Sequence, residues 1–321
     1  MSDPQPWLSV VMPIYNGERY LATALESVVA DDTQGVELII ADDGSTDRTL
    51  EIVHAYDTRA AIRIVQRERV ANWVVSTNVG LRAATGRHAC FLHQDDLWLP
   101  GRLSAIRLDL DHHPDTAFLI HPAVFIAPDG TRLGTWRCPL PAQGGVDTAL
   151  LFERLLIQNF IATPSPVFDR ELVLRLGGLD ESLWYTADWD LWLRLARAGP
   201  VRFIAAPLAG FRVHAASQTM ARDRSSADLR RQMETVLHRH LSACGVDAAN
   251  RWLDIQRTAE FSIALNAALA GRARGESGDW RSLALQFLGL RPTGWCRYLR
   301  DSRIVERVIS RVRLSTSCRR Y

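Results

Sequence analysis

Two adjacent carboxylates, Asp95 and Asp96, end an apolar run at residues 89–92. Charge is costly to bury, so paired carboxylates at the end of such a run mark the point where the chain leaves the core. The two groups repel each other unless a cation or hydrogen-bond donors lie between them. In an α/β sheet, ligands bind at the carboxyl ends of the strands. The pair predicts either a divalent-metal site for a pyrophosphate or a helix entry opened by Pro100.

Two further acidic clusters share this pattern. Asp42 and Asp43 follow the apolar run 36–41, and residues 188–190 read Asp-Trp-Asp at the start of an amphipathic stretch. Mg²⁺ and Mn²⁺ suit carboxylates that are completed by substrate phosphates. No G-x-G-x-x-G follows the first apolar run, which counts against a dinucleotide oxidoreductase, and no P-loop motif is present. The pattern favours a protein that handles phosphates through a metal.

The elements that must position these residues follow a doubly wound rhythm, in which apolar runs alternate with amphipathic stretches. This predicts an α/β fold with a mostly parallel sheet flanked by helices and a helical C-terminal extension. We expect one domain over 1–220 and a helical region over 221–321. Within the latter, one helix is expected to stop at Gly271. Strands are expected at 8–14, 36–41, 61–65, 89–92, 117–126, near 167 and at 201–204; helices near 21–29, 74–84, 100–110, 151–155 and 190–198, with another capped by Ser45 or Thr46; and a loop at 139–145.

Composition narrows the class of protein. The chain has 321 residues, 47% of them hydrophobic and 23% charged, which is typical of a globular protein with a real core. Its net charge of +2 gives no drive toward nucleic acid. All 38 basic residues are arginine, which excludes lysine chemistry and is typical of a G+C-rich bacterial coding sequence.

The expected location is the cytoplasm. The five cysteines are scattered without a C-x-x-C pair, which favours a reducing compartment. The first residues lack the basic end and apolar stretch of a signal peptide, and no window of about 18 apolar residues could span a bilayer.

Several stretches in a fixed order resemble glycosyltransferase family two over residues 7–217. They are LSVVMPIYNG at 8–17, LIIADDGSTD at 38–47, STNVG at 76–80 with ATG at 84–86, FLHQDDLW at 91–98, ADWDLWLRL at 187–195 and FRVH at 211–214. The resemblance implies a GT-A fold, which is Rossmann-like, and an inverting transfer of a sugar from a nucleoside diphosphate.

The resemblance also implies a donor site. In it Asp43 accepts a hydrogen bond from an imide N–H of the nucleotide base, and Pro13 and Tyr15 line the same pocket. Core or turn roles for Pro13 and Tyr15, and a turn-capping role for Asp42, stay open. Arg212 either neutralises phosphate charge or is a solvated strand residue. The full donor-binding set is Pro13, Tyr15, Asp43, Asn78, His93, Asp95 and Arg212.

The metal motif of the family, D-x-D followed by another Asp, aligns with residues 93–96. We expect Asp95 to be the principal ligand of Mn²⁺ or Mg²⁺, supported by Asp96, with His214 close to the metal or the diphosphate. His93 replaces the first Asp of the motif, so one negative charge is missing. A neutral imidazole there can still ligate a metal or hydrogen-bond a ribose hydroxyl.

The resemblance assigns the general base to Asp188, because an acceptor hydroxyl needs a carboxylate within hydrogen-bond reach as its proton leaves. The Glu that precedes this residue in the family is Ala187 here, which removes a like charge that would raise the pKa of the base. Asp190 is expected to cap the helix from residue 191, with catalysis as the alternative. Acceptor sugars are expected to stack on Trp184, Trp189 or Trp192, although a core role suits Trp192.

The final stretch, 294–321, holds eight arginines against Asp301 and Glu306. Apolar residues at 304, 305, 308, 309 and 312 share one helical face. Such a helix can lie on an anionic membrane, or it can pack on its own domain with a solvated charged edge. No aromatic residues alternate with basic ones as nucleic-acid binding would require.

The leading hypothesis is a metal-dependent inverting glycosyltransferase at the inner face of the cell membrane. Its donor would be a UDP-, dTDP- or GDP-sugar, and its acceptor a glycan or a lipid-linked saccharide in polysaccharide biosynthesis. A sugar-phosphate nucleotidyltransferase is the first alternative, although the Gly-rich basic loop it needs is replaced by residues 13–16. A sugar-nucleotide-binding protein with lost or weak activity is the second, favoured by His93 and Ala187.

Overall fold

The computed structural model describes residues 5–214, 225–242 and 249–317. Its main sheet has eight strands in the order β3-β2-β1-β4-β10-β6-β11-β9, and a smaller sheet has the order β5-β12-β7-β8. The main-sheet strands are β1 (Leu8–Ile14), β2 (Val36–Asp42), β3 (Ala61–Gln66), β4 (His88–Phe91), β6 (Phe118–Ile120), β9 (Gly144–Val146), β10 (Val167–Asp169) and β11 (Val201–Phe203). The smaller sheet holds β5 (Leu97–Trp98), β7 (Ala123–Ile126), β8 (Arg132–Trp136) and β12 (Ala209–Arg212).

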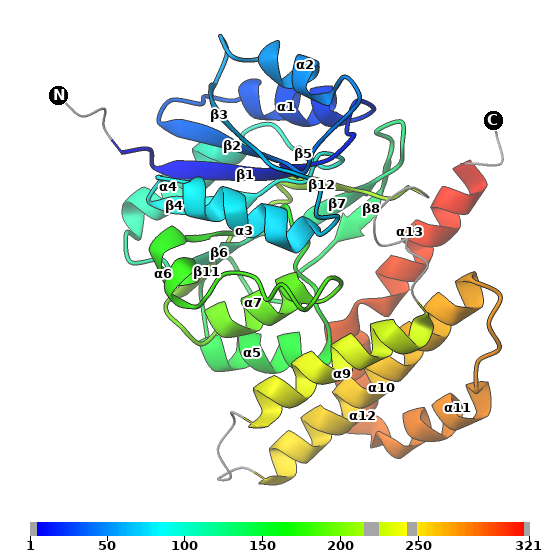
Figure 1. Cartoon of the computed structure of the whole chain (residues 1–321). Coiled ribbons are helices and arrows are strands. Elements are labelled where there is room, and N and C mark those ends of the chain that lie inside the picture. The colour runs from blue at the N-terminus through cyan, green and yellow to red at the C-terminus, as the bar shows by residue number, and fades with distance from the viewer. Residues whose placement is uncertain (1–4, 215–224, 243–248, 318–321) are drawn as a thin grey trace.

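Helices cover both faces of the main sheet (Figure 1). Because side chains alternate along a strand, Val11 of β1 packs toward α3, α5 and α7, while Val10 and Met12 pack toward α1 and α4. The helices before the C-terminal region are α1 (Leu21–Val29), α2 (Thr49–His54), α3 (Trp73–Ala83), α4 (Arg102–His112), α5 (Thr148–Ile157), α6 (Arg170–Arg175) and α7 (Ala187–Leu195). This confirms the predicted α/β fold.

The single strand predicted at 117–126 is two strands in different sheets. β6 ends before His121-Pro122, and β7 begins after it. Proline has no N–H for a sheet ladder, so the chain changes sheet at Pro122. Three more strands, β5, β8 and β12, were not expected, and β9 lies in the segment expected to be a loop.

The C-terminal region consists of helices, as expected, and packs below the sheet layer in Figure 1. It comprises α9 (Ser226–Ser242), α10 (Ala249–Ala273), α11 (Trp280–Gly289), α12 (Arg291–Ser302) and α13 (Ile304–Ser317). The helix expected to stop at Gly271 continues to Ala273. No helix within the described ranges is long and apolar enough to cross a membrane.

The largest hydrophobic cluster includes residues from both sides of position 220. Val236 of α9 and Ile255 of α10 are fully buried in the same cluster as Leu155 of α5 and Leu191 of α7. α9 and α10 thus share the core of the preceding chain. The predicted boundary between residues 220 and 221 itself lies outside the described residues.

Candidate active site

Three parallel strands end at one edge of the main sheet, and candidate residues follow each of them. β1 pairs in parallel with β2 on one side and with β4 on the other. Tyr15 follows β1, Asp43 follows β2, and residues 92–96 follow β4. Gln94 joins two of these ends, because its Oε1 accepts from the Tyr15 N–H at 2.8 Å and its Nε2 donates to the Tyr15 carbonyl at 3.0 Å.

Asp42 has the turn-capping role that the sequence left open. Its Oδ1 accepts from the backbone N–H of Ser45 at 3.1 Å and from the Ser45 hydroxyl at 2.5 Å. Ser45 therefore does not cap the following helix, as had been expected. Nor does Thr46, because α2 begins at Thr49 with Arg48 at its N-cap and no capping side chain. Asp47 lies just before this start and accepts from the backbone N–H of Thr49 at 3.0 Å.

Asp43 is held by the loop that follows β3. Its carboxylate accepts from the backbone N–H groups of Val70 at 2.9 Å and Ala71 at 2.8 Å, and from Nη1 of Arg69 at 3.1 Å. Gly44 makes this approach possible: its φ is +79°, and a Cβ there would lie 3.2 Å from the Arg69 nitrogen. The loop thus lies directly against the residue expected to meet the nucleotide base.

Arg69 was not among the sequence candidates. Its guanidinium lies 3.1 Å from the centroid of the Tyr15 ring, which is half-buried. Pro13 is buried within β1 and pairs in register with Ala41. The charged run 67–69 after a strand at this edge was the available signal for Arg69.

Asp95 is paired with His214. Nε2 of His214 lies 2.9 Å from Oδ2 of Asp95, and the His214 ring packs 5.1 Å from the ring of Tyr20. Burial acts to raise the pKa of Asp95, but the His214 hydrogen bond and the two nearby imidazoles, His93 and His214, hold it below its usual value. Because β12 pairs with β5, His214 after β12 lies beside Asp95 before β5, although the two residues are far apart in the sequence.

Asp96 lies behind Asp95 and is 2% exposed. Its Oδ1 accepts from the backbone N–H of Arg212 at 2.9 Å. Burial, and then the charge of Asp95, raises the pKa of Asp96 well above its usual value. The Arg212 side chain donates to the carbonyls of Asp95 at 2.7 Å and of Ala127 and Pro128 at 3.0 Å. Arg212 is therefore buried, and its hydrogen bonds fix the turn that holds Asp95 and Asp96, which we call the acidic turn. It is not a solvated strand residue.

His93 lies edge-on to Trp73, with ring centroids 5.1 Å apart. Burial lowers the pKa of His93, which favours the neutral form of its imidazole. Three buried polar atoms around Asp95 have no hydrogen-bond partner: Nε2 of His93, Oδ2 of Asp96 and Nδ1 of His214. Buried polar atoms are almost always paired, so these three are open to a hydrogen bond or coordination from a ligand.

The residue types fit a metal that is completed by substrate. Nowhere in the described chain do three or more His, Cys, Asp or Glu side chains gather to hold a metal ion. Mg²⁺ usually takes only one or two carboxylates from the protein and the rest of its ligands from phosphates and water. Asp95 with His214 offers a donor set of that size.

Asp188 lies in the first turn of α7 and is half-buried. Its Oδ2 accepts from Nδ2 of Asn159 and from Oγ1 of Thr163, both at 3.2 Å, and its Oδ1 accepts from the backbone N–H of Trp189 at 2.7 Å. Burial raises the pKa of Asp188 to about 6, and these hydrogen bonds act in the opposite direction. Asn159 and Thr163 carry no sequence signal that would have identified them.

Sheet topology places Asp188 at the same edge as the acidic turn. β10 runs antiparallel to β4, with Val167 opposite Cys90, so residues 158–166 reach the sheet where β4 ends. A second connection runs through Trp73, which touches His93 and donates from Nε1 to the carbonyl of Trp184 at 2.7 Å. Asp188 and Asp95 therefore belong to one side of the molecule.

Asp190 does not cap a helix. α7 begins at Ala187 with Thr186 at its N-cap, so the prediction is wrong by about one turn. Asp190 is fully buried and pairs with Arg194 at 2.8 Å, Arg239 at 2.9 Å and His240 at 3.0 Å. Against the effect of burial, these partners lower its pKa to about 2. The cluster fastens α7 to α9.

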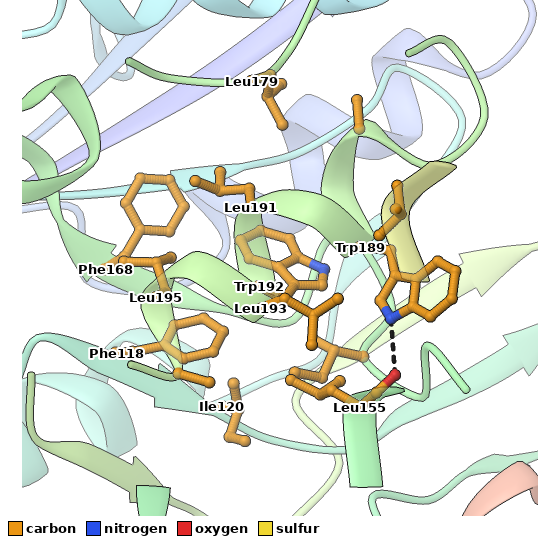
Figure 2. Packing of buried hydrophobic residues seen from close by; sticks show 14 of the residues in the cluster. Phe118, Ile120, Leu155, Phe168, Leu179, Trp189, Leu191, Trp192, Leu193 and Leu195 are labelled. Carbon is orange, nitrogen blue, oxygen red and sulfur yellow. Dashed lines mark hydrogen bonds between the residues drawn. The ribbon is translucent and has the colours of Figure 1, made fainter. Parts of the chain in front are cut away.

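The three tryptophans are buried and form no acceptor platform. The expectation is wrong for Trp184 and Trp189, whereas the core role left open for Trp192 is confirmed. Figure 2 shows Trp189 and Trp192 within the hydrophobic core, where Trp189 donates from Nε1 to the carbonyl of Leu155 at 2.7 Å. Trp192 stacks on Phe118 with ring centroids 5.5 Å apart. Trp184 is 7% exposed. The apolar face of α7 is buried, and this burial decides the positions of Trp189 and Trp192.

Asn78 is not brought to the other donor-binding candidates. Its Nδ2 donates to the Leu179 carbonyl at 2.8 Å and to Oε1 of Glu181 at 3.0 Å, and its Oδ1 accepts from the Leu179 N–H at 2.9 Å. These bonds occupy both ends of the amide. Asn78 thus links α3 by hydrogen bonds to residues 179–181, which precede α7.

Comparison with known proteins agrees with this geometry. Residues 9–166 match the family model of glycosyl transferase family 2. The matched residues make up just under half of the chain. They confirm its resemblance to that family, and the fold is of the GT-A type.

Curated relatives share about a quarter to a third of the matched residues. An uncharacterized glycosyltransferase of Rickettsia typhi is 26% identical over 228 residues, which cover 67% of this chain and 66% of the relative. An uncharacterized protein of Mycobacterium tuberculosis is 32% identical over 219 residues, covering 65% and 59% of the two chains. The match thus spans just under two thirds of the length of these relatives.

Solved structures show the same fold at low identity. Residues 1–349 of Staphylococcus aureus TarS, in complex with UDP-GlcNAc, superpose with a TM-score of 0.69 and 17% identity, covering 94% of this chain and 90% of TarS. The mannosyltransferase PcManGT from Pyrobaculum calidifontis, in complex with GDP-Man and Mn²⁺, gives a TM-score of 0.54 and 18% identity, covering 97% and 88%.

Proposed function

We propose that this protein is a glycosyltransferase, which transfers a sugar, with inversion, from a nucleoside-diphosphate donor to a hydroxyl of a glycan or lipid-linked acceptor in polysaccharide biosynthesis. The supporting observation is the position of Asp188. It is a carboxylate with a raised pKa of about 6, held by neutral donors at the sheet edge that also carries Asp95 and Asp96. UDP-, dTDP- and GDP-sugars are the donors to consider, because the solved neighbours were captured with UDP-GlcNAc and GDP-Man.

The proposed reaction is a single displacement. The acceptor oxygen forms a bond to the anomeric carbon as the bond from that carbon to the diphosphate breaks, and the acceptor proton passes to Asp188. With a pKa of about 6, Asp188 is mostly ionised at pH 7 and is a stronger base than an ordinary aspartate. Attack opposite the leaving group inverts the anomeric configuration.

The base of the donor is proposed to bind between the β1 end and the loop after β3. Tyr15 and Arg69 offer flat surfaces, and Asp43 offers the acceptor for a base N–H. Pro13 is proposed to line the same base site from within β1, and His93 to hydrogen-bond a ribose hydroxyl. Asn78 stays outside the proposal because its amide already has partners.

Asp95 and His214 are the proposed protein ligands of Mn²⁺ or Mg²⁺, with Asp96 and Arg212 fixing the turn behind them. A bound divalent ion would neutralise charge on the departing diphosphate. A sugar-nucleotide-binding protein with weak activity is the alternative, favoured by the absence of a third His, Cys, Asp or Glu ligand among the residues described. Donor hydrolysis with Mn²⁺ and after chelation separates the two, because a pure binder shows no metal-stimulated turnover.

Inversion is tested with water as the acceptor. The protein is incubated with UDP-, dTDP- and GDP-sugars, and the anomer released first is followed by proton NMR before mutarotation. We expect one donor to give the opposite anomer. Release of the same anomer would contradict the proposed single displacement. An Asp111→Asn variant, altered at an exposed aspartate of α4, serves as the control and should behave like the parent.

The C-terminal helices are proposed to touch an anionic lipid surface. Residues 280–317 contain eight arginines and two acidic residues. Leu285 and Leu288 of α11 are 70% and 61% exposed, and Val305 of α13 is 58% exposed. Exposed leucines beside excess arginine suit the interface of an anionic bilayer.

Sedimentation with vesicles tests this contact. We expect binding to vesicles with anionic phosphatidylglycerol and little binding to neutral phosphatidylcholine vesicles. A double variant, Leu285→Ser with Leu288→Ser, should bind less while keeping donor hydrolysis. Equal sedimentation with both vesicle types would overturn the contact without affecting the proposed transfer.

A further inference from the structure

The segment between α5 and β10, residues 158–166, connects the C-terminal helices with Asp188. At its start Gln158 is 7% exposed. Oε1 of Gln158 accepts from Oγ of Ser262 at 3.1 Å and from Nδ2 of Asn266 at 2.8 Å, both on α10. The backbone next to Asn159 is thereby fixed from the C-terminal region.

The orientation of the Asn159 amide is set by its own hydrogen bonds. Its Oδ1 accepts from the backbone N–H of Ile161 at 3.1 Å, which leaves the NH₂ group to face Asp188 at 3.2 Å. Thr163, which is 9% exposed, brings its hydroxyl to the same carboxylate oxygen at 3.2 Å. Two neutral donors from one loop therefore converge on Oδ2 of Asp188.

A carboxylate offers about four lone-pair positions for hydrogen bonds. Asn159, Thr163 and the Trp189 N–H fill three of them, which fixes the plane of the group and leaves one position for an acceptor hydroxyl. We propose that Asn159 and Thr163 are positioning residues that hold the Asp188 carboxylate in its reactive orientation. This inference rests on the proposed function, in which Asp188 is the base.

Within the described structure, only neutral groups donate hydrogen bonds to the Asp188 carboxylate. No charged side chain there hydrogen-bonds or ion-pairs with Asp188: on α7, Asp190 and Arg194 are engaged with each other, and on α9, Arg239 and His240 turn to Asp190. Burial therefore raises the pKa of Asp188, and the bonds from Trp189, Thr163 and Asn159 oppose it. Removing one donor must raise that pKa further, because each bond favours the ionised form.

The test is the pH dependence of donor hydrolysis in a Thr163→Val variant, which keeps the shape of threonine but lacks its hydroxyl. The acidic limb of the kcat profile reports the pKa of the base in the donor complex. We expect this limb to move upward by roughly 0.4 to 1 pH unit, as the loss of one hydrogen bond implies. The KM for the donor should stay unchanged, and Thr163→Ser should restore the parent limb.

A buried threonine at the opposite edge of the sheet is the matched control. Thr116 precedes β6, is 4% exposed and donates its hydroxyl to the His113 carbonyl at 2.7 Å. Thr116→Val should lose similar stability without moving the acidic limb. If Thr163→Val does not fold, Asn159→Ser, whose side chain is too short to reach Asp188, carries the same test.

Three outcomes are distinguishable. An upward shift in the Thr163 or Asn159 variant, absent in Thr116→Val, supports the inference. An unchanged limb in Thr163→Val, or in Asn159→Ser where Thr163→Val does not fold, overturns it, while an inactive Asp188→Asn variant would leave the proposed function standing. Near-normal turnover in Asp188→Asn would overturn both.

Discussion

At the scale of single residues, the site depends on how differently neighbouring carboxylates are treated. Asp188 is surrounded by neutral donors and keeps a raised pKa, whereas Asp190 is surrounded by cations and has a depressed one. Two residues apart on one helix, the first is suited to proton transfer and the second to structure. The difference between their pKa values arises from their surroundings, which are the α5–β10 loop for Asp188 and α9 for Asp190.

The pH profile of the unaltered protein follows from Asp188. Because its pKa is raised to about 6, the base is protonated below that pH and ionised above it. We expect kcat to rise about tenfold per pH unit up to pH 6 and to level off above it. An acidic limb near pH 4, where a solvated aspartate titrates, would contradict this environment; donor hydrolysis across pH 4.5 to 8 decides.

At the scale of elements, α7 is fixed by contacts from a distant helix. Oε1 of Gln232 on α9 accepts from the backbone N–H groups of Trp184 at 3.2 Å and Tyr185 at 3.1 Å, just before α7 begins. Asp190 adds the ion pairs with Arg239 and His240. The orientation of the base therefore depends on α9.

Asp190→Asn should destabilise the protein by about 3 kcal/mol, because it removes the buried carboxylate that pairs with Arg194, Arg239 and the buried His240. Ionised Asp190 stabilises the folded protein fully above the pKa of about 4 that an aspartate has in the unfolded chain. This contribution is lost as the pH falls toward 2, the pKa of Asp190 in the folded protein. Urea unfolding at pH 7 and pH 3 should show the larger difference at pH 7. Asp254→Asn, in an exposed pair with Arg257, should change stability by less than about 0.5 kcal/mol; a similar loss in both variants would contradict the buried cluster.

The sequence predicts an element correctly where its local hydrophobic pattern alone determines the start and end of that element. β1 was predicted to the residue, because seven consecutive buried positions leave an unambiguous apolar run. The start of α7 was missed because Gln232, 47 residues from Tyr185, contributes to fixing it. The pairing of Asp95 with His214 was expected only through the family resemblance, since it requires β5 and β12 to lie side by side. Asn159 and Thr163 lie in no pattern that predicts their contacts, and for Arg69 the only signal was the charged run 67–69 after a strand.

At the scale of the whole molecule, the GT-A sheet and the C-terminal helices share one hydrophobic core. Val236, Leu237 and Ile255 cover α5 and α7, so their removal would expose a large apolar surface. The helical region is thus part of the structure that holds the base.

A chain ending at residue 220 should therefore fail to unfold cooperatively. It loses the contacts of α9 and α10 and the partners of Asp190. Together these contacts contribute more to the free energy of unfolding than the net stability of a typical domain. A chain ending at residue 303, which keeps α9 and α10 but lacks α13, is the comparison and should retain a transition. Thermal unfolding followed by circular dichroism distinguishes them, and a sharp transition in the shorter chain would show that the sheet domain is independent.

The most direct measurement is turnover and donor affinity in Asp188→Asn, which keeps the shape of the side chain but removes its basicity. Isothermal titration with the best donor and Mn²⁺ should give a Kd within about threefold of the parent, while kcat falls by roughly 10²- to 10⁴-fold. A variant that binds the donor normally and still turns over near the parent rate would show that Asp188 is not the base, and the account of this site would fail.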